Sequence, residues 1–116
     1  MRKDIQMSSG KLAAQAGHAF GDALHESEKT NKNAVLNYRN ESKGGSKVML
    51  AAKKESDLIK AYIQLKELNI PCSIVVDRNH IHLPDFDGSP VITGLGVGPC
   101  TKNGSKQVLK KFQVYK

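Results

Sequence analysis

Cys72-Ser-Ile-Val-Val-Asp77 is an apolar stretch rich in β-branched residues, and the elements on either side of it can be placed from it. Such a composition is typical of a strand in a protein core. A break at Asn69-Ile-Pro71 precedes the stretch, and a polar turn from Asp77 to His80 follows it. We therefore predict a core strand that ends in a carboxylate.

Helical and strand-like patterns alternate around this strand. The further predicted elements are a short helix at 34–39, a strand at 47–53, a helix capped by Ser56 and reaching 68, strands at 80–83 and 91–97, a helix at 101–109 and an extended piece at 112–115. This order predicts an α/β fold with one mixed sheet and helices packed on it. The 116 residues, 39% of them hydrophobic, are expected to form a single domain, 1–116.

The first helix is predicted to begin at Ser8 and Ser9, which can cap it, and to run to about Glu28. Its apolar residues recur at helical spacing and form one stripe: Leu12, Ala16, Ala19, Phe20 and Ala23. Small residues lie beside the stripe at positions 13, 17 and 21. Because a glycine inside a helix costs about 1 kcal/mol relative to alanine, we expect Ala13, Gly17 and Gly21 to admit another backbone closely.

The charge of the chain predicts a polyanionic partner. Its net charge is +7, and phosphates neutralised by lysine and arginine release counterions. Aromatic residues make up only 5% and tryptophan is absent, which disfavours a protein that stacks single-stranded bases on exposed rings. A protein that contacts the phosphate backbone of a nucleic acid fits better, although the same charge is compatible with an ordinary solvated surface.

The location and the cysteines are simple to interpret. No stretch approaches the roughly 20 apolar residues of a membrane span, and no apolar run follows the first basic residues as in a signal peptide, so we expect a cytoplasmic protein. Cys72 and Cys100 are far apart and are expected to be reduced thiols. Cys100 lies in a turn-like segment, but no histidine stands beside it to activate a nucleophile.

A polar ribbon runs along the first helix. Lys11, Gln15, His18 and Asp22 are separated by four, three and four residues, so their side chains share a narrow arc. Lys11 lies in the first turn, where the helix dipole already favours an anion. A phosphate or a developing oxyanion near Lys11 would compensate its charge. The alternative is that the whole ribbon is an ordinary solvated helix face.

Two further places could carry chemistry. Asp77 ends the core strand, where open α/β sheets place ligand-binding groups, and it could orient a histidine or a water molecule; the alternative is a turn residue that caps its own loop. His80 and His82 alternate about Ile81 and would share one face of a strand. A metal site there would lack a clear third ligand.

The run Gly10-Lys-Leu-Ala-Ala-Gln-Ala-Gly-His-Ala19 closely resembles the signature of the archaeal and eukaryotic (type 2) peptidyl-tRNA hydrolases, in which Gly-Lys, Ala-Ala-Gln and His-Ala occur at this spacing. The segments Lys47 to Leu50, Ile70 to Asp77 and Gly94 to Pro99 follow in the family's order, and Leu109 to Tyr115 resembles its closing segment. The resemblance therefore covers nearly the whole chain.

This resemblance implies an α/β domain with a four-stranded mixed sheet and an enzyme that hydrolyses the ester between peptide and tRNA, using no metal or organic cofactor. The site residues that it implies are Lys11, Gln15, His18, Asp77 and Thr93. His18, or a water oriented by Asp77, would supply the base, and Lys11 would stabilise the oxyanion or hold a tRNA phosphate. The implied partner is peptidyl-tRNA. The sequence does not fix the oligomeric state and leaves a homodimer open.

The chain departs from the family's pattern in two places. Family members have an apolar strand before the first helix, whereas this chain offers only Met1-Arg-Lys-Asp-Ile-Gln6, so the first strand is expected to be shortened or missing. The family's turn after the aspartate usually reads Ala-Gly-Arg-Thr-Gln, whereas Arg78 to His82 places Ile81 where a threonine is expected. Two other functions therefore stay open: a non-catalytic RNA-binding or regulatory domain on the same fold, and an esterase for small acyl substrates.

Overall fold

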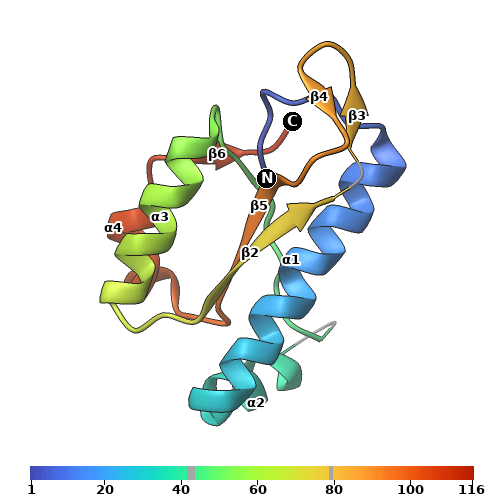
Figure 1. Ribbon diagram of the computed structural model, residues 1–116. Coiled ribbons are helices and arrows are strands. Elements are labelled where there is room, and N and C mark those ends of the chain that lie inside the picture. The colour runs from blue at the N-terminus through green and yellow to red at the C-terminus, as the bar shows by residue number, and fades with distance from the viewer. Residues whose placement is uncertain (42–43, 79) are drawn as a thin grey trace.

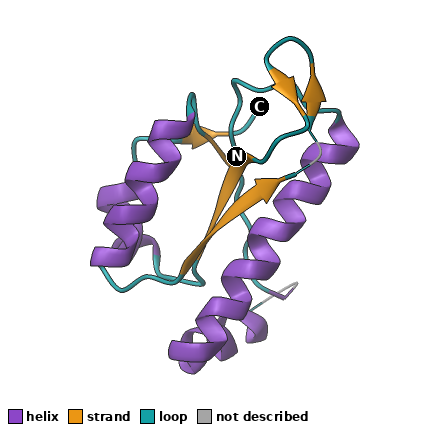
Figure 2. Cartoon of the chain, in the orientation of Figure 1, coloured by secondary structure: helices purple, strands orange, loops and turns teal. Residues whose placement is uncertain are grey.

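The computed structural model describes residues 1–41, 44–78 and 80–116, without the side chain of His82 (Figures 1 and 2). Its elements are α1 (Ser9–Thr30), α2 (Lys32–Asn40), β1 (Leu50–Ala51), α3 (Glu55–Glu67), β2 (Cys72–Asp77), β3 (Ile81–His82), β4 (Phe86–Asp87), β5 (Val91–Val97), α4 (Lys102–Leu109) and β6 (Gln113–Val114). The strands are hydrogen-bonded in three antiparallel pairs, β1 with β6, β2 with β5 and β3 with β4. The prediction of an α/β fold is confirmed, but the strands form small two-stranded antiparallel pairs where one four-stranded mixed sheet was expected.

The pair of β2 and β5 lies at the centre of the molecule. Its register joins Cys72 to Val97 at one end and Asp77 to Val91 at the other, with an irregularity after Val75. Helix α1 covers one face of this pair, and α3 and α4 lie on its other side (Figure 1). One core cluster lies on each side, with Leu65 in the α3 and α4 cluster and Ala19 in the α1 cluster. The strand β2 ends, at Asp77, beside the beginning of α1 (Figure 1).

A short N-terminal segment takes the place of the expected first strand. The amide of Arg2 donates to the Thr93 carbonyl of β5 at 2.9 Å, and the amide of Lys3 donates to the Ala52 carbonyl, just after β1, at 2.8 Å. Arg2 and Ala52 form a single parallel bridge. The segment thus connects β5 to β1, and the prediction that the first strand is shortened or missing is confirmed.

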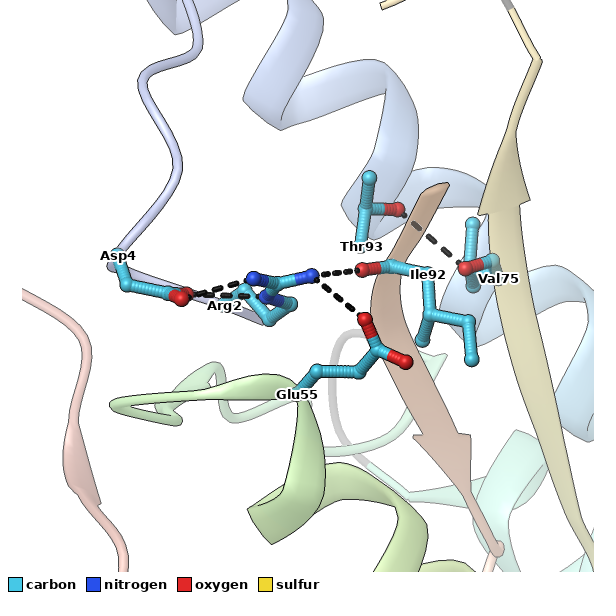
Figure 3. A network of polar contacts seen from close by, with 6 residues as sticks. All are labelled: Arg2, Asp4, Glu55, Val75, Ile92 and Thr93. Atoms are coloured by element: carbon cyan, nitrogen blue, oxygen red, sulfur yellow. Dashed lines mark hydrogen bonds and ion pairs between the residues drawn. The ribbon is translucent and has the colours of Figure 1, made fainter. Parts of the chain in front are cut away.

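The side chain of Arg2 reinforces this connection. It is buried, with 7% of its surface exposed, and it forms a bidentate pair with Asp4 at 2.8 and 3.0 Å. The same guanidinium donates to Glu55 at 3.3 Å and to the Ile92 carbonyl at 3.1 Å (Figure 3). The hydrogen bond from Arg2 holds the pKa of the Asp4 carboxyl below its ordinary value. A buried guanidinium with these partners is fully compensated and fixes β5 immediately before Thr93.

Two predicted element boundaries need correction. Of the expected strand at 47–53 only Leu50–Ala51 is a strand. Helix α3 begins at Glu55, so Ser56 lies inside the helix and does not cap it; the capping position is Lys54, whose side chain makes no capping bond. Two acidic residues in the first turn, Glu55 and Asp57, suit the positive end of the helix dipole instead.

The close approach of a second backbone to α1 does occur, but not at the predicted residues. Ala13, Gly17 and Gly21 are exposed, and a Cβ atom added at either glycine would meet nothing within 4 Å. The contact is made from the sheet, because a Cβ atom on Gly96 of β5 would lie 1.9 Å from the carbonyl oxygen of Ala19. Gly96 is therefore the residue that lets α1 lie directly on the sheet.

Candidate active site

The candidate site lies where α1 begins and β2 ends. Ser8 caps α1, as predicted, since its hydroxyl accepts from the Lys11 amide at 3.2 Å. This cap fixes the first turn and with it the position of the Lys11 side chain, which is half-buried. Asp77, the last residue of β2, is buried with 8% of its surface exposed.

Lys11 and Asp77 form an ion pair. The Nζ atom of Lys11 lies 2.7 Å from Oδ2 of Asp77. Since both side chains are largely shielded from water, their attraction is screened less than that of a surface pair. The sequence suggested a phosphate or a developing oxyanion as the partner of the Lys11 charge, whereas in the structure the protein's own carboxylate lies there. The interpretation of Lys11 as a solvated lysine is wrong.

A second acceptor approaches the same ammonium group. Nδ1 of His80 lies 2.9 Å from Nζ of Lys11, and His80 is buried with 3% of its surface exposed. An ammonium group only donates, so Nδ1 is the acceptor and carries no proton in this arrangement. One Lys11 proton thus points to His80, while the Asp77 carboxylate lies against the same ammonium group as its ion-pair partner.

Gln15 and Thr93 form the neighbouring contact between α1 and the sheet. Gln15 follows Lys11 by one helical turn, and its Oε1 atom accepts from the Thr93 hydroxyl at 2.8 Å. The hydroxyl also lies 3.5 Å from the Val75 carbonyl, as Figure 3 shows, but its single proton favours the shorter contact. Because Thr93 is fully buried, this bond satisfies a hydroxyl that water does not reach.

The other members of the polar ribbon lie outside this cluster. His18 and Asp22 are exposed, and within the described part of the chain neither side chain has a hydrogen bond. His18 follows Lys11 by seven residues, which places it about 10 Å further along the helix axis. The structure thus brings Lys11, Gln15, Asp77 and Thr93 to the interface of α1 and the sheet, and leaves His18 on the surface.

The turn after Asp77 lies only partly within the described residues. Ile81, which stands where the family's threonine was expected, has 66% of its surface exposed. The prediction that His80 and His82 share one face concerns the His82 side chain, which lies outside the described set, as does Asn79. Among the described residues, no group of three His, Cys, Asp or Glu side chains is arranged to hold a metal ion.

The part played by His80 was missed by sequence reasoning. His80 was considered only as a metal ligand, because its distance of three residues from Asp77 does not reveal where its ring points. The signal that could have found it is the combination of a histidine and an aspartate in one turn at the end of a core strand.

The two cysteines differ in burial. Both cysteines are free thiols; Cys72 is buried and Cys100 exposed, and burial raises the pKa of the Cys72 thiol. A raised pKa disfavours the thiolate that nucleophilic chemistry requires.

Among the helices of the described residues, none combines the length and apolar character that crossing a membrane takes.

Comparison with known proteins gives one consistent result. Residues 1–115 match the family described as peptidyl-tRNA hydrolase PTH2. The chain is 32% identical over 99 residues to the peptidyl-tRNA hydrolase of Methanocaldococcus jannaschii, covering 85% of this chain and 81% of that protein. It is 31% identical over 114 residues to that of Methanococcus vannielii, covering 98% and 93%. A Dictyostelium discoideum protein named probable peptidyl-tRNA hydrolase 2 is 30% identical over 115 residues, covering 99% of this chain and 52% of that protein.

Proposed function

Because the chain belongs to the peptidyl-tRNA hydrolase family PTH2, it is a peptidyl-tRNA hydrolase, and we propose that Lys11 and Asp77 form the centre at which the ester is cleaved. In this reaction water adds to the ester carbonyl, and the products are a peptide with a free carboxylate and a tRNA with a free terminal hydroxyl. The observation that carries the proposal is the 2.7 Å contact between Lys11 Nζ and Asp77 Oδ2 at the junction of α1 and β2.

Lys11 is proposed to stabilise the oxyanion. Its ammonium is ion-paired with Asp77 and donates one proton to His80, and another of its protons can reach the carbonyl oxygen of a bound ester. Negative charge grows on that oxygen when water attacks, and a donor already in place stabilises it more than the neutral ester. The alternative role of Lys11, binding a tRNA phosphate, would change affinity rather than turnover.

Asp77 is proposed to have two roles: it orients the attacking water, and it holds the Lys11 ammonium group. A carboxylate at the end of a strand can accept a proton from water while it keeps its contact with an ammonium group. Gln15 and Thr93 are proposed to hold α1 and β5 in register beside this centre, through the 2.8 Å bond between them. His18 is exposed on α1, so we assign it to contact with the bound substrate and not to proton transfer at the ester.

The partner of this centre is peptidyl-tRNA, and the compartment we propose is the cytoplasm, where translation takes place. Residues 1–116 are proposed to act as one domain. The proposed centre uses side chains of one chain, and the homodimer that the sequence left open is not part of this proposal. Family membership favours the hydrolase over the non-catalytic RNA-binding domain, and the net charge of +7 argues against an esterase for small acyl substrates.

The test is peptide release from an N-blocked aminoacyl-tRNA by the parent protein, Lys11→Ala and Lys60→Ala. Lys60 is exposed on α3, so its replacement removes the same unit of charge away from the centre. We expect Lys11→Ala to lower kcat by about 100-fold or more, as loss of an oxyanion donor does, and Lys60→Ala to keep parent kinetics.

Filter binding of deacylated tRNA separates the two roles of Lys11. Equal affinity of parent and Lys11→Ala supports the oxyanion role, whereas weaker binding with normal kcat supports the phosphate role. Near-normal kcat and affinity in Lys11→Ala would refute both. Circular dichroism of all three proteins checks that the fold is kept.

A further inference from the structure

His80 is held in place by contacts that do not involve α1. Its carbonyl oxygen accepts from the Gly88 amide at 2.9 Å, beyond the end of β4. Its ring meets the Phe86 ring edge-on, with centroids 4.9 Å apart and planes at 63°. With 3% of its surface exposed, the imidazole has little room to turn. The β3 and β4 hairpin therefore presents Nδ1 of His80 at a fixed point beside Lys11.

We propose that His80 is a positioning residue, whose Nδ1 atom accepts one proton of the Lys11 ammonium and so fixes its rotation with another proton directed at the ester carbonyl. The proposal rests on the proposed function. It deepens that function by naming the group that orients Lys11.

This contact matters because a lysine ammonium rotates freely about its last bond. The 2.7 Å contact with Asp77 is an ion pair, which holds the ammonium group in place. The 2.9 Å hydrogen bond to Nδ1 of His80 fixes the rotation about the Cε–Nζ bond, and tetrahedral geometry then sets the directions of the other two protons. A donor fixed before the substrate arrives needs no reorganisation when charge develops on the carbonyl oxygen.

The matched variants are His80→Asn and His80→Leu. The asparagine Oδ1 atom is bonded to Cγ, as Nδ1 is in histidine, so it can accept from Lys11. Leucine has the same shape as asparagine but no acceptor. Both variants lose the ring that packs on Phe86, so a difference between them reports on the acceptor and not on packing.

We expect His80→Leu to lower kcat by roughly 10- to 100-fold with KM little changed, because the ammonium is misdirected and not removed. His80→Asn should stay within about threefold of the parent in kcat. Equal losses in the two variants would overturn the proposal, since they would assign His80 a packing role alone. Thermal unfolding of both variants shows whether they are equally folded.

A second readout does not depend on turnover. The NMR signal of the Lys11 ammonium, assigned through its loss in Lys11→Ala, is expected in the parent and in His80→Asn, because an ammonium group held by its hydrogen bond and its ion pair exchanges slowly with water. It should shift or disappear in His80→Leu. An unchanged Lys11 signal in His80→Leu would refute the contact even if kcat fell. If no form released peptide, the proposed function would fail, and the ammonium signal alone would decide whether His80 orients Lys11.

Discussion

The position of Lys11 in its helix indicates what kind of group lies beside it. A positive side chain in the first turn of a helix opposes the helix dipole, so the sequence alone predicts an anion nearby. In the structure this anion is Asp77, which lies 66 positions later in the chain. Sequence could mark Lys11 and Asp77 separately, each on a local argument. It could not join them, or add His80, because which side chains meet across α1 and β2 is decided by packing.

His18 provides the prediction at this scale. Its ring is exposed about 10 Å along the helix from Lys11, so it can contact substrate but cannot reach the same ester oxygen. His18→Ala is expected to raise KM several-fold while kcat falls less than about threefold. Steady-state release of peptide measures both constants. A fall in kcat as large as that of Lys11→Ala would contradict this assignment and make His18 the base.

Among the elements, those with strong local signals were predicted best. The strands Cys72–Asp77 and Val91–Val97 have the predicted bounds, because β-branched runs with clear ends leave few alternatives. The first helix begins at its predicted cap. The strand at 47–53 was predicted too long, since its pairing partners, β6 and the Met1–Lys3 segment, are short. The close backbone contact of α1 was predicted at Gly17 and Gly21 of the helix, whereas the structure has it at Gly96 of β5. Periodicity does not show which of two packed elements carries the small residue.

The interface of α1 and β5 gives a matched pair of stability predictions. Gly96→Ala places a Cβ atom against the Ala19 carbonyl, a backbone atom that cannot move alone, so we expect a loss of about 1–3 kcal/mol or more. Gly17→Ala adds the same atom in open space on an exposed helix surface and should gain up to about 1 kcal/mol. Urea unfolding followed by circular dichroism measures both. Equal stability of the two variants would show that α1 does not rest on Gly96.

For the whole molecule, the relevant property is its charge. The net charge of +7 predicts that tRNA binding releases counterions, so affinity should fall steeply as salt is added. We expect the logarithm of the binding constant to fall with the logarithm of the salt concentration with a slope of about −2 or steeper. Fluorescence anisotropy of labelled tRNA between low and physiological salt measures it. A flat response would mean that the positive charge serves solubility and not binding.

The contact between Gly96 and Ala19 also bears on the position of Lys11, the proposed oxyanion donor. Ala19 lies eight residues after Lys11, about 12 Å along the helix. A tilt of α1 of about 10° around that contact would displace Lys11 by about 2 Å, enough to separate its ammonium from Asp77. The distance between the Lys11 ammonium and Asp77 therefore depends on how closely Gly96 lets α1 approach β5, although Gly96 is not part of the proposed centre.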